Sequence, residues 1–151
     1  MASQKLSGIL VLAITLAGMI LTVTAASVVS VTEALPTRGS ISAINVGIYS
    51  DSGCNQKLTS IDWGEISPGG TVTKTIYIKN GGSNQMMLKM TKTNWNPSSA
   101  DGPISIDWNR EGTNINAGQS LQAEITLSVS SDISGITDFS VDIVITGVDM
   151  G

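Results

Sequence analysis

Apolar and polar residues alternate in seven short runs after Gly39. In the clearest run, from Leu121 to Val129, every second residue is apolar and the residues between them are polar. This period of two gives a strand one apolar and one polar face, which is typical of antiparallel sheets that pack on one side. The runs predict strands at residues 44–49, 58–63, 72–78, 87–91, 104–108, 121–129 and 139–146.

Glycine, proline and asparagine separate these runs, for example at Ser67–Gly70 and at Asn80–Ser83. Such residues favour the turns that join neighbouring strands. About seven short strands joined by turns predict an all-β fold, an immunoglobulin-like antiparallel β-sandwich, over residues 39–151. The Cys…Trp…Cys pattern of antibody domains is absent, because Cys54 is the one cysteine. The residues expected in the core include Trp63, Trp108, Ile125, Leu127, Val141 and Ile143.

A leader precedes this domain. Lys5 is the only charged residue before Glu33, residues 8–21 are almost entirely apolar, and small residues follow them. This order predicts a secretory signal peptide. The alternative is a retained membrane anchor, since a membrane-spanning helix needs about 20 apolar residues. In both cases Lys5 favours a domain on the outer side of the membrane, exported to the cell surface or beyond. We expect residues 1–26 to form this hydrophobic helix, with Leu10, Leu12, Ile14, Leu16 and Ile20 among its apolar residues.

Residues 27–38 predict an extended segment between the leader and the domain. The part from Ser27 to Leu35 is apolar and rich in β-branched residues, and Pro36 follows it. The segment is either a linker, the tail of an anchor, or a strand that completes the sheet of a neighbouring molecule. In the last case the donated side chains include Val28, Val29, Val31 and Leu35.

The charge of the domain restricts its partners. From Gly39 onwards there are six basic and eleven acidic residues, and the basic residues are scattered singly. The absence of a basic patch argues against binding to nucleic acid or to anionic lipid surfaces. Cys54 is the single cysteine, so no disulfide can form within the chain. It is either a small buried residue or a free thiol that can cross-link two copies.

The sequence offers little for catalysis. It has no histidine, which removes Ser–His–Asp and Cys–His pairs and histidine-ligated zinc. Two acidic pairs flank tryptophans, Asp62 and Glu65 beside Trp63, and Asp107 and Glu111 beside Trp108. We expect these carboxylates, like Asp132 and Asp138 near the last strand, to serve turns and solubility rather than hydrolysis or calcium binding. We expect Trp63 and Trp108 to fill the core. The competing interpretation is that the tryptophans form an exposed sugar-binding platform. We therefore predict no enzyme, no cofactor and no metal site.

Several segments carry a resemblance to known proteins: Val46–Cys54, Ile61–Gly64, Ser67–Gly70, Tyr77–Asn80, Trp95–Pro97 and Ile133–Phe139. Together they resemble small secreted archaeal proteins of immunoglobulin-like type. The resemblance extends over nearly all of the chain after Gly39 and implies a surface domain. A leader followed by one compact sandwich is also similar, in architecture alone, to the camelysin and TasA-like group. That likeness implies extracellular fibres that assemble by strand donation.

These observations support two hypotheses of function. The first is a non-enzymatic secreted or cell-surface protein with a structural or adhesive role, in its specific form a pilus-like filament subunit. Its donated strand is Ser27–Leu35, and its acceptor is an exposed sheet edge of another copy. The alternative is a membrane-anchored monomer that serves as a binding or accessory module of a surface complex. The expected partners are thus the membrane, through the N-terminal segment, and other copies or other surface proteins.

Overall fold

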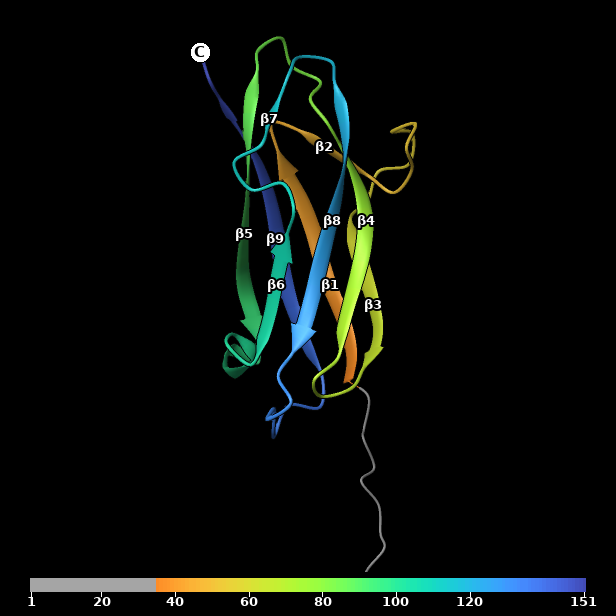
Figure 1. The fold of residues 1–151 in the computed structure, drawn as a ribbon, viewed down its shortest axis with the longest axis vertical. Coiled ribbons are helices and arrows are strands. Elements are labelled where there is room, and N and C mark those ends of the chain that lie inside the picture. The colour runs from red at the N-terminus through yellow and green to blue at the C-terminus, as the bar shows by residue number, and fades with distance from the viewer. Residues whose placement is uncertain (1–34) are drawn as a thin grey trace, which may run out of the picture. The chain divides into compact units, whose positions relative to one another are not determined.

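Two β-sheets lie face to face in the computed structural model, which describes residues 35–151 (Figure 1). Sheet A has five strands in the order β3-β1-β9-β5-β7, and sheet B has four in the order β2-β4-β8-β6. The strands of sheet A are β1 (Leu35–Ile44), β3 (Ser60–Ile66), β5 (Met86–Asn96), β7 (Asn114–Ile115) and β9 (Phe139–Asp149). The strands of sheet B are β2 (Gly47–Tyr49), β4 (Thr71–Lys79), β6 (Ile104–Trp108) and β8 (Ser120–Val129). The predicted all-β sandwich is confirmed.

The core lies where the apolar faces of the two sheets meet. Sheet A contributes alternate residues of β9, and sheet B contributes alternate residues of β8, because successive side chains of a strand point to opposite faces. Most of the residues expected in the core are buried, namely Trp63, Ile125, Leu127, Val141 and Ile143. Trp108 is only half-buried, because it is the last residue of β6 and lies at the side of the sandwich.

The apolar run at residues 44–49 is not one strand. Asn45 has a φ of 63°, in the left-handed region that asparagine tolerates, and there the chain passes from sheet A to sheet B. The Asn45 side chain donates from Nδ2 to the carbonyl oxygen of Gly147 at 3.2 Å, which holds the corner. In consequence Ile48 is buried in sheet B, whereas Ile44 is 51 % exposed at the end of β1.

β1 is an inner strand of sheet A, antiparallel to β3 on one side and parallel to β9 on the other. The parallel ladder extends from the Thr37–Phe139 pair to the Ile44–Thr146 pair. The expectation of a wholly antiparallel sandwich is wrong for β1 and β9, because alternation fixes the face of a side chain and not the direction of a strand. The first residue of β1 is Leu35, so the sandwich begins before the expected boundary at Gly39.

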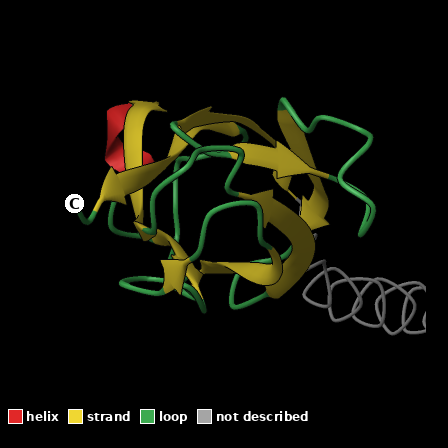
Figure 2. Cartoon of the chain, turned by 90° about the horizontal axis from the view of Figure 1, so that it is seen from above, coloured by secondary structure: helices red, strands yellow, loops and turns green. Residues whose placement is uncertain are grey.

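The predicted leader and most of the predicted donor segment lie outside the described residues. The residues singled out there are Leu10, Leu12, Ile14, Leu16 and Ile20 of the leader and Val28, Val29 and Val31 of the donor segment. Leu35 is described, and it pairs with Ile66 of β3. Within residues 35–151 no helix is long and apolar enough to cross a membrane. The short 3-10 helix η2 (Ser98–Ala100), drawn in red in Figure 2, follows β5.

Candidate functional site

Asp62, from the first acidic pair, supports a bulge in β3. One carboxylate oxygen of Asp62 accepts a hydrogen bond from the backbone N–H of Gly64 at 2.9 Å. Gly64 has a φ of +77°, which glycine adopts at no steric cost, and the pairing of β3 with β1 shifts register at this level. The Thr37 hydroxyl donates to the Gly64 carbonyl at 3.0 Å and fixes the bulge from the neighbouring strand. A bulge of this kind makes an edge strand a poor template for further pairing.

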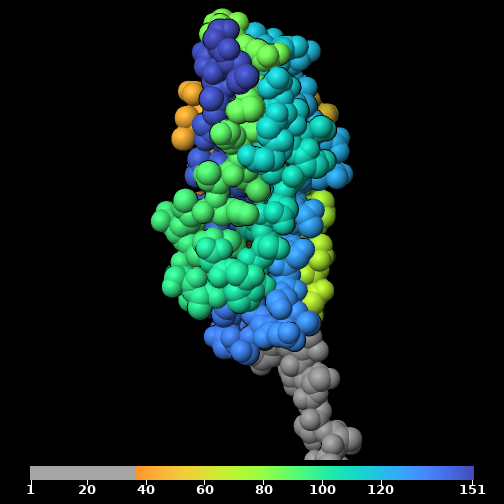
Figure 3. Space-filling model, turned by 60° about the vertical axis from the view of Figure 1, so that its left-hand side comes forward, coloured from red at the N-terminus to blue at the C-terminus, as the bar shows by residue number. Residues whose placement is uncertain are grey.

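Glu111, from the second acidic pair, closes one side of the sandwich between β5 and β6. Glu111 accepts hydrogen bonds from the indole Nε1 of Trp108 at 2.7 Å and from the backbone N–H of Met90 at 3.0 Å. Lys92 donates from Nζ to the carbonyl of Ile106 at 2.7 Å on the same side. Figure 3 shows this side filled by the segments in green and teal. The side chains thus occupy backbone groups that an incoming strand would need.

The three tryptophans have separate structural roles. Trp63 is 2 % exposed, and so cannot present its ring to a sugar. Trp108 is tied to Glu111, as described above. Trp95 is half-buried and stacks on Phe139, with ring centroids 6.0 Å apart and an interplanar angle of 29°. The structure therefore does not bring Trp63 together with the other two on one exposed surface.

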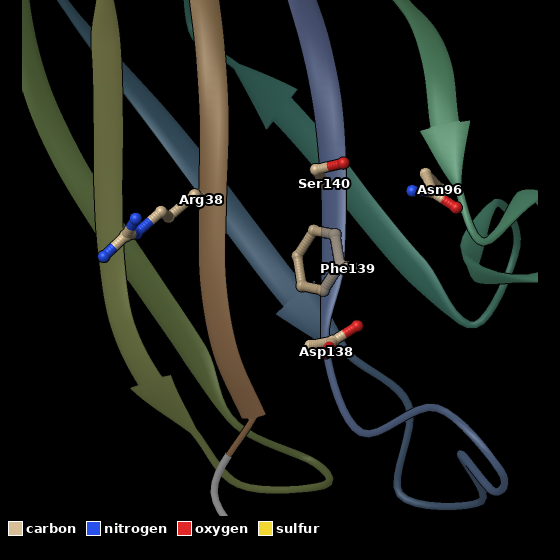
Figure 4. Close-up of a pocket in the computed structure, with 5 residues that line it drawn as sticks. All are labelled: Arg38, Asn96, Asp138, Phe139 and Ser140. Atoms are coloured by element: carbon tan, nitrogen blue, oxygen red, sulfur yellow. The ribbon is translucent and has the colours of Figure 1, made fainter.

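A hollow of about 370 Å³ lies beside Phe139 at the end of the sandwich where β1 begins. It is lined by Arg38, Asn96, Asp138, Phe139 and Ser140 (Figure 4). Phe139 itself is buried, and the guanidinium of Arg38 extends away from Asn96 and Ser140 in the close-up. The polar groups of this hollow thus do not converge on one point, as the polar groups of a small-molecule site do.

A polar cluster lies on the outer face of sheet A. Asp142 of β9 accepts hydrogen bonds from the Asn94 side chain at 2.7 Å and from the Ser40 hydroxyl. These bonds, Asn94 first, hold the pKa of Asp142 below its ordinary value of 3.8. The Asp142 carboxylate is therefore negatively charged at neutral pH, and its hydrogen bonds join β9 to β5 and to β1.

A second carboxylate that accepts several hydrogen bonds, that of Asp51, holds the loop after β2. Asp51 accepts hydrogen bonds from the backbone N–H groups of Gln56 at 2.7 Å and Asn55 at 3.0 Å, which lower its pKa. Cys54 lies in this loop with a φ of 54° and is half-buried, so it is not part of the core. Among residues 35–151 no three acidic or cysteine side chains are close enough together to hold a metal ion.

A groove lies at the opposite end of the sandwich, uppermost in Figure 1, at the corner between β1 and β2. We call it the β1–β2 groove. Its volume is about 270 Å³, and its walls are mostly apolar. It is lined by Ile41, Ser42, Ala43, Val46, Gly47, Ile48, Lys57, Leu58 and Thr59.

This groove exists because β3 is shorter than β1. The pairing of the two strands ends at Ser40 and Ser60, and one further bond joins the Ile41 N–H to the Thr59 carbonyl at 3.1 Å. Beyond that bond β1 continues to Ile44 with β9 on one side only, as far as the described residues show. This unpaired stretch of β1 is therefore short and lies at one end of an inner strand, a position that alternation alone does not reveal.

The exposed apolar side chains gather at the same end of the sandwich. Ile44 is 51 % exposed, Met150 is 50 % exposed and Val148 is 37 % exposed. Ile44 pairs with Thr146 in β9, and Val148 follows two residues later on the same strand. An exposed apolar cluster beside an open strand edge is typical of a surface that another chain covers.

A scan against protein-family models found no match for this chain, and a search of curated proteins found none. The arguments for function therefore depend on the geometry of the described residues. That geometry separates two kinds of surface. The Asp62 bulge lies in the edge strand β3, and the Glu111 and Lys92 contacts lie between β5 and β6, whereas the end with the β1–β2 groove is apolar and partly unpaired. β4 is also partly unpaired, because β2 pairs with it only from Tyr77 to Lys79.

Proposed function

We propose that this chain is an exported, non-enzymatic β-sandwich protein with a structural or adhesive role at the cell surface. In its specific form it is the subunit of a filament that assembles by strand donation. The donated strand is the part of Ser27–Leu35 that precedes Leu35, because Leu35 pairs with Ile66 in its own sheet. The acceptor is a sheet edge of the next copy. The sandwich is of immunoglobulin-like type in this proposal, because two face-to-face sheets joined by short turns support that architecture.

One observation carries the proposal. β1 begins with Leu35 at one end of the sandwich, and the unpaired stretch of β1 lies at the other end. An interface made from two different surfaces at opposite ends of a molecule joins copies head to tail, and they add in a row when the rotation between them does not close a ring.

The test is the mass and N-terminal sequence of the protein isolated from its native cells, together with electron microscopy of the same preparation. A mature chain that begins near Ser27, found in fibres, is the expected result. Intact chains from Met1 to Gly151 in the membrane fraction, without fibres, would overturn the filament and leave an anchored domain.

A second candidate function is a membrane-anchored monomer that acts as a module of a surface complex. The specific observation in its favour is that β1 is paired on both sides over most of its length within its own sheet. A sandwich that contains all its own strands does not need a second copy to fold. This candidate predicts that a fragment that begins at Leu35 is folded and monomeric, and that residues 1–26 are retained in the membrane.

A further inference from the structure

We infer that the outer face of sheet B binds an acidic polysaccharide. The binding surface is a row of residues that crosses the sheet near the end that is uppermost in Figure 1. We call it the tyrosine row, and it consists of Lys57, Tyr49, Tyr77, Gln122 and Arg110, with Lys79 beside them. The inference rests on the proposed adhesive role at the cell surface and adds the class of partner to it. It does not depend on how copies of the chain assemble.

Strand pairing brings these residues together, although they lie far apart in the sequence. Tyr49 of β2 pairs with Tyr77 of β4, and Tyr77 pairs with Gln122 of β8. An isolated bridge between Tyr49 and Lys57 extends the row on one side. On the other side, the Nε of Arg110 donates to the carbonyl oxygen of Gln122 at 2.7 Å. Neighbouring strands lie about 4.8 Å apart, so the row is about 19 Å long.

The row faces solvent. Ile48 of β2 and Ile78 of β4 are buried in the core. Successive side chains of a strand point to opposite faces, so Tyr49 and Tyr77 point outwards. Lys79 follows two residues after Tyr77 and lies on the same face, where it is exposed. A ligand can therefore contact both rings and this lysine from one side of the sheet.

The ring of Tyr49 lies along its own strand. A Cβ atom added at Gly47 would be 2.6 Å from Cε2 and 2.7 Å from the hydroxyl oxygen of Tyr49, so the ring occupies the space above this glycine. A ring in this position packs one face against the strand and turns the other face to solvent. That face suits the C–H groups on one side of a sugar ring, because both are flat and apolar. Lys79 pairs with Gly47, which places a cation beside the ring.

The row gathers three of the six basic residues in residues 39–151. The same range has eleven acidic residues, and its basic residues are scattered along the sequence. Lys57, Lys79 and Arg110 meet on sheet B only through strand pairing. A local group of cations on an acidic domain attracts an anionic partner. Carboxylates are anions that lysine and arginine bind by charge-assisted hydrogen bonds.

The modest charge of the row favours a polysaccharide over a nucleic acid. Glu124, two residues after Gln122 on β8, is exposed on the same face and borders the row. The Asp51 carboxylate is held within its own loop by the N–H groups of Asn55 and Gln56. A phosphodiester chain binds to a continuous basic groove. A chain with one carboxylate on each sugar needs only a few spaced cations, and the exposed amide of Gln122 can bond its hydroxyl groups.

The first test measures the binding of polygalacturonate to the full-length chain, isolated from its native cells in a neutral detergent, by isothermal titration calorimetry. Dextran supplies sugar rings without charge, and poly-glutamate supplies carboxylates without sugar rings. We expect polygalacturonate to bind at least about tenfold more tightly than either, and less tightly as salt is added. Absence of binding would overturn the inference, and so would equal binding of poly-glutamate or tighter binding of oligothymidylate.

The second test removes the cations. Lys57→Ala and Lys79→Ala should each weaken the binding of polygalacturonate about threefold, and the double variant about tenfold, as exposed charge contacts do. Lys89→Ala is the matched control, because Lys89 is an exposed lysine on the outer face of sheet A. Wild-type affinity in the double variant, or an equal loss in Lys89→Ala, would overturn the tyrosine row as the binding surface.

The third test moves the ring of Tyr49 without removing it. Gly47→Ala places a methyl group where the ring lies, and the end of the tyrosine side chain can turn aside, so thermal unfolding should stay close to that of the wild type. We expect binding of polygalacturonate to weaken about threefold. Gly81→Ala is the matched control, because a Cβ atom there meets no atom within 4 Å apart from its chain neighbours.

Tyr77→Thr keeps the role of the rings testable if the Gly47 variant fails to fold. Threonine favours strands, so β4 should be retained while the second ring is lost. We expect this variant also to bind polygalacturonate about threefold more weakly. Wild-type affinity in every folded variant of the two would overturn the contact between tyrosine rings and sugar.

Surface labelling separates this inference from the proposed function. Intact cells are treated with a biotin reagent that does not cross membranes, and we expect the chain to be labelled. A chain that binds polygalacturonate but is labelled only after the cells are broken would overturn the proposed function and not the binding surface. A chain that is labelled on intact cells but does not bind polygalacturonate would overturn this inference alone.

Discussion

Trp63 lies directly against Gly39, across the pairing of β1 with β3. A Cβ atom added at Gly39 would be 3.4 Å from the indole Nε1 of Trp63. That N–H is buried and has no hydrogen-bond partner among the described residues. The core of the sandwich thus contains a large aromatic residue whose polar atom faces a residue without a side chain. A buried donor without a partner costs on the order of 1–3 kcal/mol.

We predict that Gly39→Ser stabilises the domain relative to Gly39→Ala by about 1 kcal/mol, because the serine hydroxyl can accept from the Trp63 Nε1. Gly39→Val adds volume at the same point and should destabilise the domain by about 1–3 kcal/mol. Urea unfolding of the fragment that begins at Leu35, followed by tryptophan fluorescence, measures these differences. Equal stability of the serine and alanine variants would show that the serine hydroxyl does not accept a hydrogen bond from the Trp63 indole N–H.

A pH dependence follows from Asp142. Because its pKa is lower in the folded state than the ordinary 3.8, the carboxylate stabilises the fold above that value. This contribution is lost as the pH falls through the folded pKa. We therefore expect the stability difference between the wild type and Asp142→Asn to shrink below about pH 3.8.

The cause of the low pKa is testable by NMR titration of the Asp142 carboxyl. Asn94→Gly removes the first hydrogen bond without strain, since Asn94 has a φ of 55°, and should raise the pKa of Asp142. Asn84→Ala is the control, because the Asn84 side chain bonds Asp149 instead. A pKa of Asp142 that stays unchanged in Asn94→Gly would contradict the assignment.

Asn80 is fully buried and holds the turn after β4. Its amide nitrogen donates to the carbonyl oxygens of Ile115 at 3.1 Å and Asn84 at 2.8 Å, and its side-chain oxygen accepts from the N–H of Gly82 at 2.9 Å. We expect Asn80→Ala to lower the free energy of unfolding by about 2–4 kcal/mol, because one buried and two partly buried backbone groups lose their partner. Ser83→Ala, at an exposed position of the same loop, should change it by less than about 0.5 kcal/mol.

Glu111 should protect the β5 side of the sandwich as well as stabilise it. Glu111→Ala frees the N–H of Met90 and the indole of Trp108, at a cost of about 1–2 kcal/mol. We also expect slow aggregation of the purified domain, measured by light scattering, because the freed edge can pair with other chains. Glu111→Gln keeps one acceptor and should lie between alanine and the wild type. Aggregation of both variants at the wild-type rate would show that Glu111 does not guard the edge.

The sequence predicts the strands with a clear period of two, and it misses those that lack one. β4, β8 and β9 alternate over most of their length, and each is present in the structure. β1 is missed because its inward-facing residues are small or polar, such as Thr37 and Gly39. β7 has only two residues, too few for any period.

The candidate site depends on features that no local pattern contains. The β1–β2 groove exists because β3 stops at Ser60 and because Asn45 turns the chain between sheets. Both are relations between segments far apart in the sequence. In the sequence, Ile44 and Ile48 read as two positions of one apolar face, and only the left-handed backbone of Asn45 separates them. For two of the carboxylates beside tryptophans, Asp62 and Glu111, the structural roles expected from their places at strand ends are present.

The parallel pairing of β1 with β9 has a mechanical consequence. β1 enters at one end of the sandwich, and β9 leaves at the other, near the C-terminus (Figure 1). Tension applied between the two ends of the domain therefore acts along both strands in opposite directions. The hydrogen bonds from the Thr37–Phe139 pair to the Ile44–Thr146 pair lie across this force and share it. They must break together, rather than one after another as in a strand peeled from its end, so the domain resists being pulled apart lengthwise.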